Sequence, residues 1–224
     1  PDDCLYCVRN ENCELQSLAA ELHIRERKVQ RKSINLKLDL SSPSIVRDPA
    51  KCILCGRCVR VCDEVQSVST FEFVKRGCNM YIGTTMSRDL NFSSCIGCGQ
   101  CVLACPTSAL NERSNIDEVI DSLNNPNLIP VVQFAPSIPV SLAEEFGMKV
   151  GKDLNGILNA TLKKIGFKYV FDTSVAADIA ILELAHELLN RKEENQGQPI
   201  ISACCPAWVK FMEQFYPNQL NLLS

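Results

Sequence analysis

The stretch that decides the fold is "CILCGRCVRVC", residues 52–62, and its spacing returns in "CIGCGQCVLACP", residues 95–106. Both stretches follow the pattern C-x-x-C-x-x-C-x-x-x-C. The first three cysteines of each pattern must lie on one tight loop with their sulfurs turned to the same side. Gly56, Gly97 and Gly99 suit such loops, because glycine adopts backbone angles that other residues avoid. The repeat therefore predicts two neighbouring metal centres held by thiolates.

This spacing is typical of bacterial ferredoxins with two 4Fe-4S clusters, in which the fourth cysteine of each run binds the cluster of the other run. We assign one cluster to Cys52, Cys55, Cys58 and Cys105, and the second to Cys95, Cys98, Cys101 and Cys62. We expect each fourth cysteine at the start of a helix. Zinc is the alternative metal, but zinc sites seldom use this spacing. Pro106 follows the second run as in ferredoxins, whereas Asp63 follows the first.

Composition narrows the class of protein. The 224 residues include fourteen cysteines and have a formal net charge of −3. A disulfide framework is the alternative use of the cysteines, but the chain exceeds the size that needs such bridges and lacks secretory features. This net charge does not indicate a surface that binds nucleic acid. The basic run at residues 25–32 is interpreted as a solvated helical face. No apolar run approaches the roughly 18 residues of a membrane span.

The first residues predict a third metal centre. The stretch "CLYCVRNENC" has the spacing C-x-x-C-x5-C and offers three ligands: Cys4, Cys7 and Cys13. A four-coordinate cluster needs one more. His23 is the nearby histidine, and we interpret it as a surface residue. Apolar residues at helical spacing predict a helix that packs over this cluster: Leu15, Leu18, Ala19 and Leu22.

The rest of the chain predicts a hairpin and then an α/β layer. Alternation in residues 70–86 predicts a hairpin that turns near Gly77, with Cys78 as a structural or incidental thiol. After residue 128, strands alternate with helices of crossover length, which predicts a mainly parallel sheet. The expected strands are residues 129–134, 168–172 and 199–203. One expected helix starts at Asp153 or Asn155 and ends at Gly166. No dinucleotide fingerprint or P-loop is present.

The fold class is therefore mixed, α+β followed by α/β. We expect a small cysteine-rich cluster domain over residues 1–40 and a two-cluster ferredoxin-like domain over residues 41–123. Residues 124–224 would form the start of an α/β domain.

A pair of neighbouring thiols, Cys204 and Cys205, lies in "PIISACCPAW", residues 199–208. Pro206 suits the first turn of a helix, so the pair would lie where a strand ends and a helix begins. Ligands bind outside the carboxyl ends of strands in open α/β sheets. A helix N-terminus also lowers the pKa of a thiol. We therefore expect reactive or ligating thiols, with two buried apolar cysteines as the alternative.

Three stretches resemble the catalytic domain of iron-only (FeFe) hydrogenases. "ISACCPAWVKF", residues 201–211, is similar to its signature T-S-C-C-P-x-W, and residues 133–147 and 166–188 resemble it in order and spacing. The N-terminal pattern resembles a cluster module with one histidine and three cysteine ligands. The iron-sulfur subunit of NADH dehydrogenase and some formate dehydrogenases share this module. Its histidine would fall one position before Pro1.

The resemblance implies reversible formation of hydrogen from two protons and two electrons. It implies three 4Fe-4S clusters and an H-cluster, a 4Fe-4S cluster with a di-iron subcluster, completed by residues outside this sequence. It leaves open a 2Fe-2S cluster upstream. Cys205 would bind the 4Fe-4S part of the H-cluster, and Cys204 would relay protons together with Glu187 and Arg191.

The implied partners are a ferredoxin or an NAD(P)H-linked flavoprotein, and a second chain or a C-terminal segment that completes the catalytic domain. We expect neither nucleic acid nor a membrane span. The expected location is the cytoplasm, with a hydrogenosome or a similar anaerobic organelle as the alternative.

Some positions depart from the family pattern. Leu184 stands where the family has a proton-relay glutamate, Pro139 stands for an arginine, and Ser202 and Ala203 replace the usual Thr-Ser. An apolar side chain cannot transfer a proton. Two further hypotheses therefore stand beside an active hydrogenase: an electron-transfer subunit, and a sensor or assembly protein with a degenerate hydrogenase domain.

Overall fold

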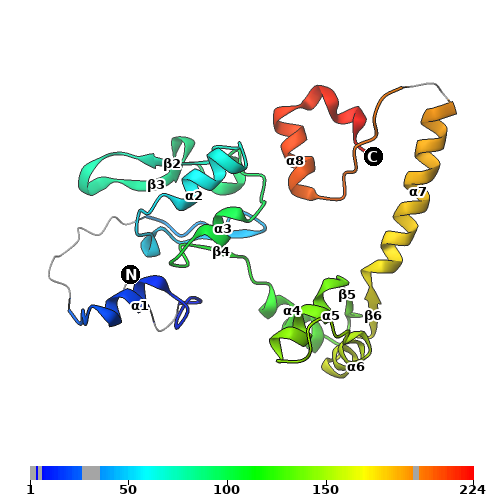
Figure 1. Ribbon diagram of the computed structural model, residues 1–224, viewed down its shortest axis with the longest axis horizontal. Helices are drawn as coiled ribbons and strands as arrows, with labels where there is room; N and C mark the ends of the chain where they lie inside the picture. Colours follow the sequence, from blue (N-terminus) through cyan, green and yellow to red (C-terminus); the bar gives the residue numbers. More distant parts are fainter. Residues whose placement is uncertain (1–3, 5–6, 27–35, 194–196) are drawn as a thin grey trace. The chain divides into compact units, whose positions relative to one another are not determined.

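The computed structural model describes residue 4 and residues 7–26, 36–193 and 197–224, and every structural statement concerns these residues. The basic run predicted as a helical face lies outside them from residue 27 onward. The chain divides into two compact units (Figure 1). The first unit comprises Pro1–Arg113 with Ala203–Asn221, and the second comprises Ser114–Ser202 with Leu222–Ser224.

The first unit begins with helix α1, Glu14–Glu21, which contains no buried residue. Three of its predicted packing residues are exposed: Leu15, Leu18 and Leu22, with 37%, 48% and 65% of their surface accessible. The helix exists as predicted, but the packing of its apolar face is not found among the described residues. His23 is exposed, with a positive φ of 52° just after the helix.

Two antiparallel strand pairs frame the cysteine runs. Strand β1, Ile45–Arg47, pairs with β4, Leu110–Glu112. Strand β2, Phe71–Val74, pairs with β3, Tyr81–Thr84, and the predicted hairpin turns through Gly77–Asn79, where Cys78 is exposed. The short helices of this unit are η2 (Pro49–Lys51), α2 (Arg57–Arg60), η3 (Val61–Val65), η4 (Gly77–Asn79), η5 (Thr85–Ser87), η6 (Leu90–Phe92) and α3 (Gln100–Ala104).

The fourth cysteine of each run does not start a helix, so this prediction was wrong. Cys62 lies in the π-helical turn η3 that continues α2, and Cys105 follows the last residue of α3. The left-handed glycines Gly56 and Gly99 precede the two helices, which therefore begin before the third cysteine. A residue four positions beyond the third cysteine then lies one turn later, where the short helix ends.

The core of this unit is a mixture of apolar side chains and cysteines. Ile45, Phe71, Leu90 and Leu110 are buried together with Cys58, Cys95, Cys101 and Cys105. A buried carboxylate, Asp39, accepts a hydrogen bond of 2.8 Å from the Leu90 amide and fixes the chain above the core. The first unit also contains helix α8, Pro206–Phe215.

The second unit has a small parallel sheet. Strand β5, Val131–Phe134, pairs in parallel with β6, Tyr169–Asp172. The surrounding helices are α4 (Ile116–Asn124), α5 (Ser137–Glu145), α6 (Asn155–Ile165) and α7 (Thr173–Glu193). Helix α6 begins where Asp153 accepts a 2.8 Å hydrogen bond from the Asn155 amide, and it ends at Gly166, as predicted.

The third predicted strand, residues 199–203, does not join this sheet. It forms one isolated parallel bridge, between Ile201 and Leu223. Leu223 directly follows the final helical turn η7 (Pro217–Leu222). That prediction was wrong for the described chain because the segment finds a local partner instead of a sheet neighbour. No described helix is long and apolar enough to cross a membrane.

Candidate metal centres

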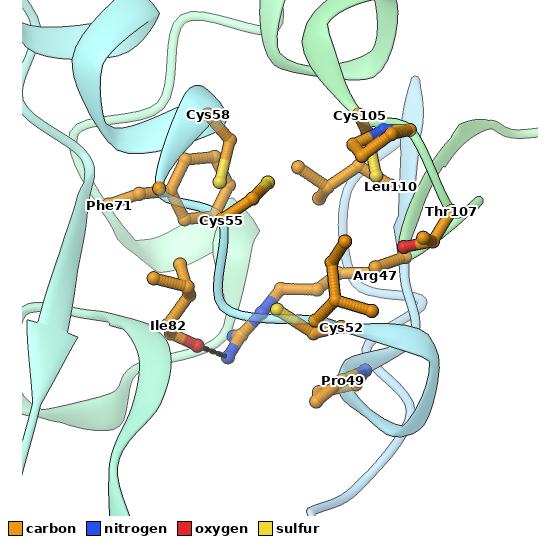
Figure 2. A pocket seen from close by; sticks show the side chains of 14 residues that line it. Arg47, Pro49, Cys52, Cys55, Cys58, Phe71, Ile82, Cys105, Thr107 and Leu110 are labelled. Carbon is orange, nitrogen blue, oxygen red and sulfur yellow. Dashed lines mark hydrogen bonds between the residues drawn. The ribbon is translucent and has the colours of Figure 1, made fainter. Parts of the chain in front are cut away.

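Four cysteines line one hollow in the first unit, the first hollow (Figure 2). They are Cys52, Cys55 and Cys58 from the first run and Cys105 from the second. The hollow measures about 470 Å³ including its opening to solvent, and its other walls are apolar apart from Arg47 and Thr107. The structure thus brings together the four residues that the sequence assigns to one cluster.

A second hollow of about 310 Å³, opening included, is lined by Cys62, Cys95, Cys98 and Cys101. These are the four cysteines assigned to the other cluster. Each hollow therefore combines three thiols of one run with the fourth thiol of the other run. Phe71 contributes to both walls and separates the two spaces.

The two loops share one backbone pattern. The amide of Leu54 donates to the Cys52 sulfur at 3.4 Å, and the amide of Gly97 donates to the Cys95 sulfur at 3.4 Å. Both donors have positive φ, 60° for Leu54 and 73° for Gly97. This left-handed conformation turns the amide toward the sulfur, and amide donors at sulfur stabilise a thiolate ligand.

One more sulfur of the second hollow accepts a hydrogen bond from a backbone amide. The amide of Thr70 donates to the Cys62 sulfur at 3.3 Å. The fourth cysteine of the first run is thus held from the loop that enters β2.

One buried thiol in each hollow, Cys58 and Cys101, resists ionisation until a metal neutralises it. Burial, with the neighbouring thiolates of Cys52, Cys105 and Cys55, raises the pKa of Cys58 to about 12. Burial and like charges also raise the pKa of Cys101. Ligation must therefore displace protons, as it does at thiolate metal sites.

Each hollow is lined by four soft thiols, and three of these eight sulfurs accept a hydrogen bond from a backbone amide. This donor chemistry suits iron-sulfur clusters. Among the described side chains, no group of three His, Cys, Asp or Glu is arranged to hold a single metal ion.

The N-terminal cysteines lie against the segment that follows Cys105. The Cys13 thiol lies 3.7 Å from the carbonyl oxygen of Pro106. Burial acts to raise the pKa of Cys7, but a hydrogen bond from the Ser108 side chain, one from the Arg9 backbone and the charges of Lys51 and Arg9 lower it overall. Cys4, the third predicted ligand, is half-buried and accepts at its backbone carbonyl a 3.2 Å hydrogen bond from the Cys7 amide.

An ion pair also joins this segment to the first cysteine run. Arg57 of α2 and Glu14 of α1 lie 3.1 Å apart. Both side chains are exposed, so the pair contributes little to stability.

Cys204 and Cys205 are exposed at the start of α8, where Cys205 is the N-cap residue and Pro206 begins the helix, as the sequence predicts. Helix α8 shares the first unit with both hollows. Lys210 of this helix lies near enough to Cys95 for its charge to oppose the rise that burial causes in the pKa of that thiol.

The predicted relay residues Glu187 and Arg191 form an ion pair on α7 in the second unit. Leu184 lies one turn before Glu187, so the three share a helix face. All three are half-buried, whereas most of α7 is exposed.

Two polar residues near the cysteines were missed in the sequence. Arg47 lines the first hollow, and Ser108 lies beside Cys7. In the sequence, only their closeness to the cysteine runs could have indicated them. Arg47 stands five residues before Cys52, and Ser108 stands three residues after Cys105.

Three parts of the chain match known families. Residues 129–224 match the C-terminal domain of the iron-only hydrogenase large subunit. Residues 1–28 match the NADH-ubiquinone oxidoreductase-G iron-sulfur binding region, and residues 51–109 match a 4Fe-4S dicluster domain.

Curated relatives match over the whole chain. NADP-reducing hydrogenase subunit HndD of Solidesulfovibrio fructosivorans is 39% identical over 230 residues, which cover 100% of this chain and 39% of the relative. Iron hydrogenase 1 of Clostridium pasteurianum is 37% identical over 222 residues, 99% of this chain and 39% of the relative. A solved FeFe hydrogenase from Chlamydomonas reinhardtii is 32% identical with a TM-score of 0.46, over 50% of this chain and 29% of that one. The chain thus spans 39% of the length of both curated relatives.

Proposed function

The chain belongs to the iron-only hydrogenase large-subunit family, and from this premise we propose that it carries electrons through three 4Fe-4S clusters to the H-cluster of an FeFe hydrogenase. The reaction would be the reversible conversion of two protons and two electrons into hydrogen. When bound, the clusters supply one-electron carriers and the H-cluster supplies the iron chemistry of hydrogen.

The observation that carries this proposal is the sorting of eight cysteines into two four-thiol hollows. In the proposed roles, Cys52, Cys55, Cys58 and Cys105 hold one cluster, and Cys95, Cys98, Cys101 and Cys62 hold the other. The amides of Leu54, Gly97 and Thr70 would then orient and stabilise the ligating sulfurs.

Cys4, Cys7 and Cys13 would bind the N-terminal cluster, with its fourth ligand outside the described residues. The contact between Cys13 and Pro106 supports this proposal, because Pro106 directly follows Cys105, a proposed ligand of the first hollow. A chain of bonded and touching atoms therefore joins the two proposed clusters.

At the catalytic end, Cys205 would ligate the 4Fe-4S part of the H-cluster, and Cys204 would hold and release a proton at its sulfur. Glu187 and Arg191 are the proposed further relay residues, because their ion pair keeps a carboxylate at a fixed place on α7. The chain spans 39% of its relatives, so completion of the H-cluster by a second chain or a further segment is part of the proposal.

A second candidate function is electron transfer without hydrogen turnover, as a subunit or as a sensory, degenerate hydrogenase-like protein. Leu184 favours it, because an apolar side chain shares the helix face of Glu187 and Arg191 and interrupts a line of proton carriers.

The proposed electron partner is a ferredoxin or an NAD(P)H-linked flavoprotein. One relative is an NADP-reducing hydrogenase subunit, which supports the nicotinamide-linked choice. The proposed location is the cytoplasm or an anaerobic organelle. A 2Fe-2S cluster upstream would extend the same relay.

Iron and sulfide analysis with EPR tests the relay. The chain prepared without oxygen should hold about twelve iron atoms, four for each of three clusters. Infrared bands of carbon monoxide and cyanide ligands in matured material with the complete catalytic domain would report the H-cluster. Clusters without those bands would support the second candidate function, and a chain without clusters would defeat both.

A further inference from the structure

Arg47 is held in place by its own strand. It is the last residue of β1 and pairs with Leu110 of β4. On its other side, its backbone exchanges two hydrogen bonds with Asp39, at 2.9 and 3.0 Å. With the backbone fixed from both sides, the side chain extends into the first hollow, as Figure 2 shows.

The guanidinium of Arg47 lies beside the proposed ligands. Its Nη2 donates to the carbonyl oxygen of Ile82 at 2.7 Å, a bond that fixes the end of the side chain. Burial lowers the pKa of Arg47, and the charges of Asp39, Cys52, Tyr81 and Cys58 act against that shift. Arginine nevertheless remains protonated in proteins. A fixed positive charge therefore faces two of the four thiols.

Among the described residues, no ion pair includes Arg47. The nearest acid in electrostatic terms is Asp39, and its oxygens are engaged elsewhere: one accepts from the Ser41 amide and hydroxyl, and the other from the Leu90 amide.

The second hollow has no equivalent charge. Its polar lining residues besides cysteine are Gln66, Thr70 and Gln100, which are all neutral. Lys210 interacts with Cys95 but does not line the hollow. Arg47 and Lys210 are both half-buried, so the difference is one of position: Arg47 lies in the wall of its hollow, whereas Lys210 does not.

We propose that Arg47 raises the reduction potential of the cluster in the first hollow. Reduction adds one negative charge to a cluster, and a fixed cation in a poorly solvated wall stabilises that added charge. Net charge and hydrogen bonding around the sulfurs are the means by which proteins set cluster potentials. The inference rests on the proposed function, since it requires a cluster in this hollow.

An EPR-monitored redox titration of the full chain with its clusters tests the inference. Arg47→Gln removes the charge and keeps a hydrogen-bond donor for Ile82. At the wild-type midpoint potential, the ratio of reduced to oxidised first-hollow cluster should be at least tenfold lower in this variant. This corresponds to a decrease of about 59 mV or more in the midpoint potential for a one-electron step. The shifted signal should be the one that Cys55→Ala abolishes. The second-hollow signal should stay in place.

Two further variants separate charge from structure. Arg47→Lys keeps the charge and should keep most of the potential. Arg76→Gln removes an exposed charge at the β2–β3 hairpin and should shift nothing. The inference would be overturned by equal falls in the reduction potential for Arg47→Gln and Arg47→Lys, by no fall in the potential for either variant, or by loss of the cluster in both. A wild-type chain without the dicluster signals would instead overturn the proposed function.

Discussion

The sulfur of Cys13 lies 3.7 Å from the carbonyl oxygen of Pro106, although 93 residues separate them in the chain. Pro106 directly follows Cys105, so the two proposed centres meet through one peptide unit. Two residues further on, the side chain of Ser108 lies close enough to Cys7 to act on the pKa of that thiol. The segment after the second cysteine run therefore contacts two of the three N-terminal cysteines.

Ser108 gives the first prediction. Its side chain is fully buried, its hydroxyl has no hydrogen-bond partner among the described residues, and it acts to lower the pKa of the nearby Cys7 thiol. Ser108→Ala should lower the reduction potential of the N-terminal cluster, because it removes a hydroxyl beside the Cys7 sulfur whose dipole can stabilise the added charge of the reduced state. A redox titration followed by EPR measures this shift.

Ser108→Gly is the matched variant. It also lacks the hydroxyl but suits the positive φ of 55° at this position. Both variants should shift the potential equally, while the glycine variant should be more stable by about 1 kcal/mol. A potential change that follows stability instead of the hydroxyl would refute the prediction.

The loop glycines give a second prediction. A Cβ at Gly56 would lie 2.8 Å from the Phe73 ring, whereas a Cβ at Gly99 would meet nothing within 4 Å. Both have positive φ, so alanine should cost about 1–2 kcal/mol in backbone strain at either position. Gly56→Ala should cost more, because the ring must also move. Anaerobic urea unfolding measures the difference, and equal losses would show that the ring moves freely.

Asp39 gives a third prediction, on acid stability. Burial acts to raise the pKa of this carboxyl, but hydrogen bonds from Ser41 and Leu90 and the charge of Arg47 outweigh it, so the pKa is lowered. A carboxyl with a lowered folded pKa stabilises the fold above its unfolded pKa of about 3.9, and this stability is lost as the pH falls through the folded value.

Asp39→Asn should therefore destabilise the chain by about 1–3 kcal/mol at pH 7, because it weakens the hydrogen bonds that Ser41 and the Leu90 amide donate to this buried side chain. The gap to wild type should narrow below about pH 4. Asp48→Asn, at a half-buried cap that already pairs with Lys51, is the control and should cost less. Unfolding measured at stepped pH values checks both, and a gap that is constant with pH would contradict the ionic role.

Leu184 gives a fourth prediction. It shares a half-buried helix face with Glu187 and Arg191. In the matured protein with a complete catalytic domain, Leu184→Glu should raise hydrogen evolution about tenfold or more, because a positioned proton carrier contributes at least that much. Leu182→Glu, on the exposed opposite face, should leave the rate unchanged. Equal effects of both substitutions, or no effect of Leu184→Glu, would exclude this relay.

The cysteine spacing predicted the central feature of the first unit, because ligand geometry restricts the backbone more strongly than packing does. The grouping of Cys105 with the first run and Cys62 with the second follows from that pattern alone. The place of Cys105 after a helix did not follow, because it depends on where Gly99 lets the helix begin.

Long-range neighbours limited the prediction elsewhere. The segment at residues 199–203 has the composition of a strand, but its partner is Leu223 and not the sheet. The entry of Arg47 into the hollow depends on its pairing with Asp39 and Leu110, which no local pattern indicates. Residues whose role comes from distant contacts leave little trace in a single sequence.

EPR of single cysteine variants tests whether the fourth cysteine of each run binds the cluster of the other run. Cys105→Ala should abolish the same cluster signal as Cys55→Ala, since both residues line the first hollow. Cys62→Ala should leave that signal and abolish the one that depends on Cys98, which lines the second hollow. Loss of the Cys55-dependent signal in Cys62→Ala, with its survival in Cys105→Ala, would contradict the account.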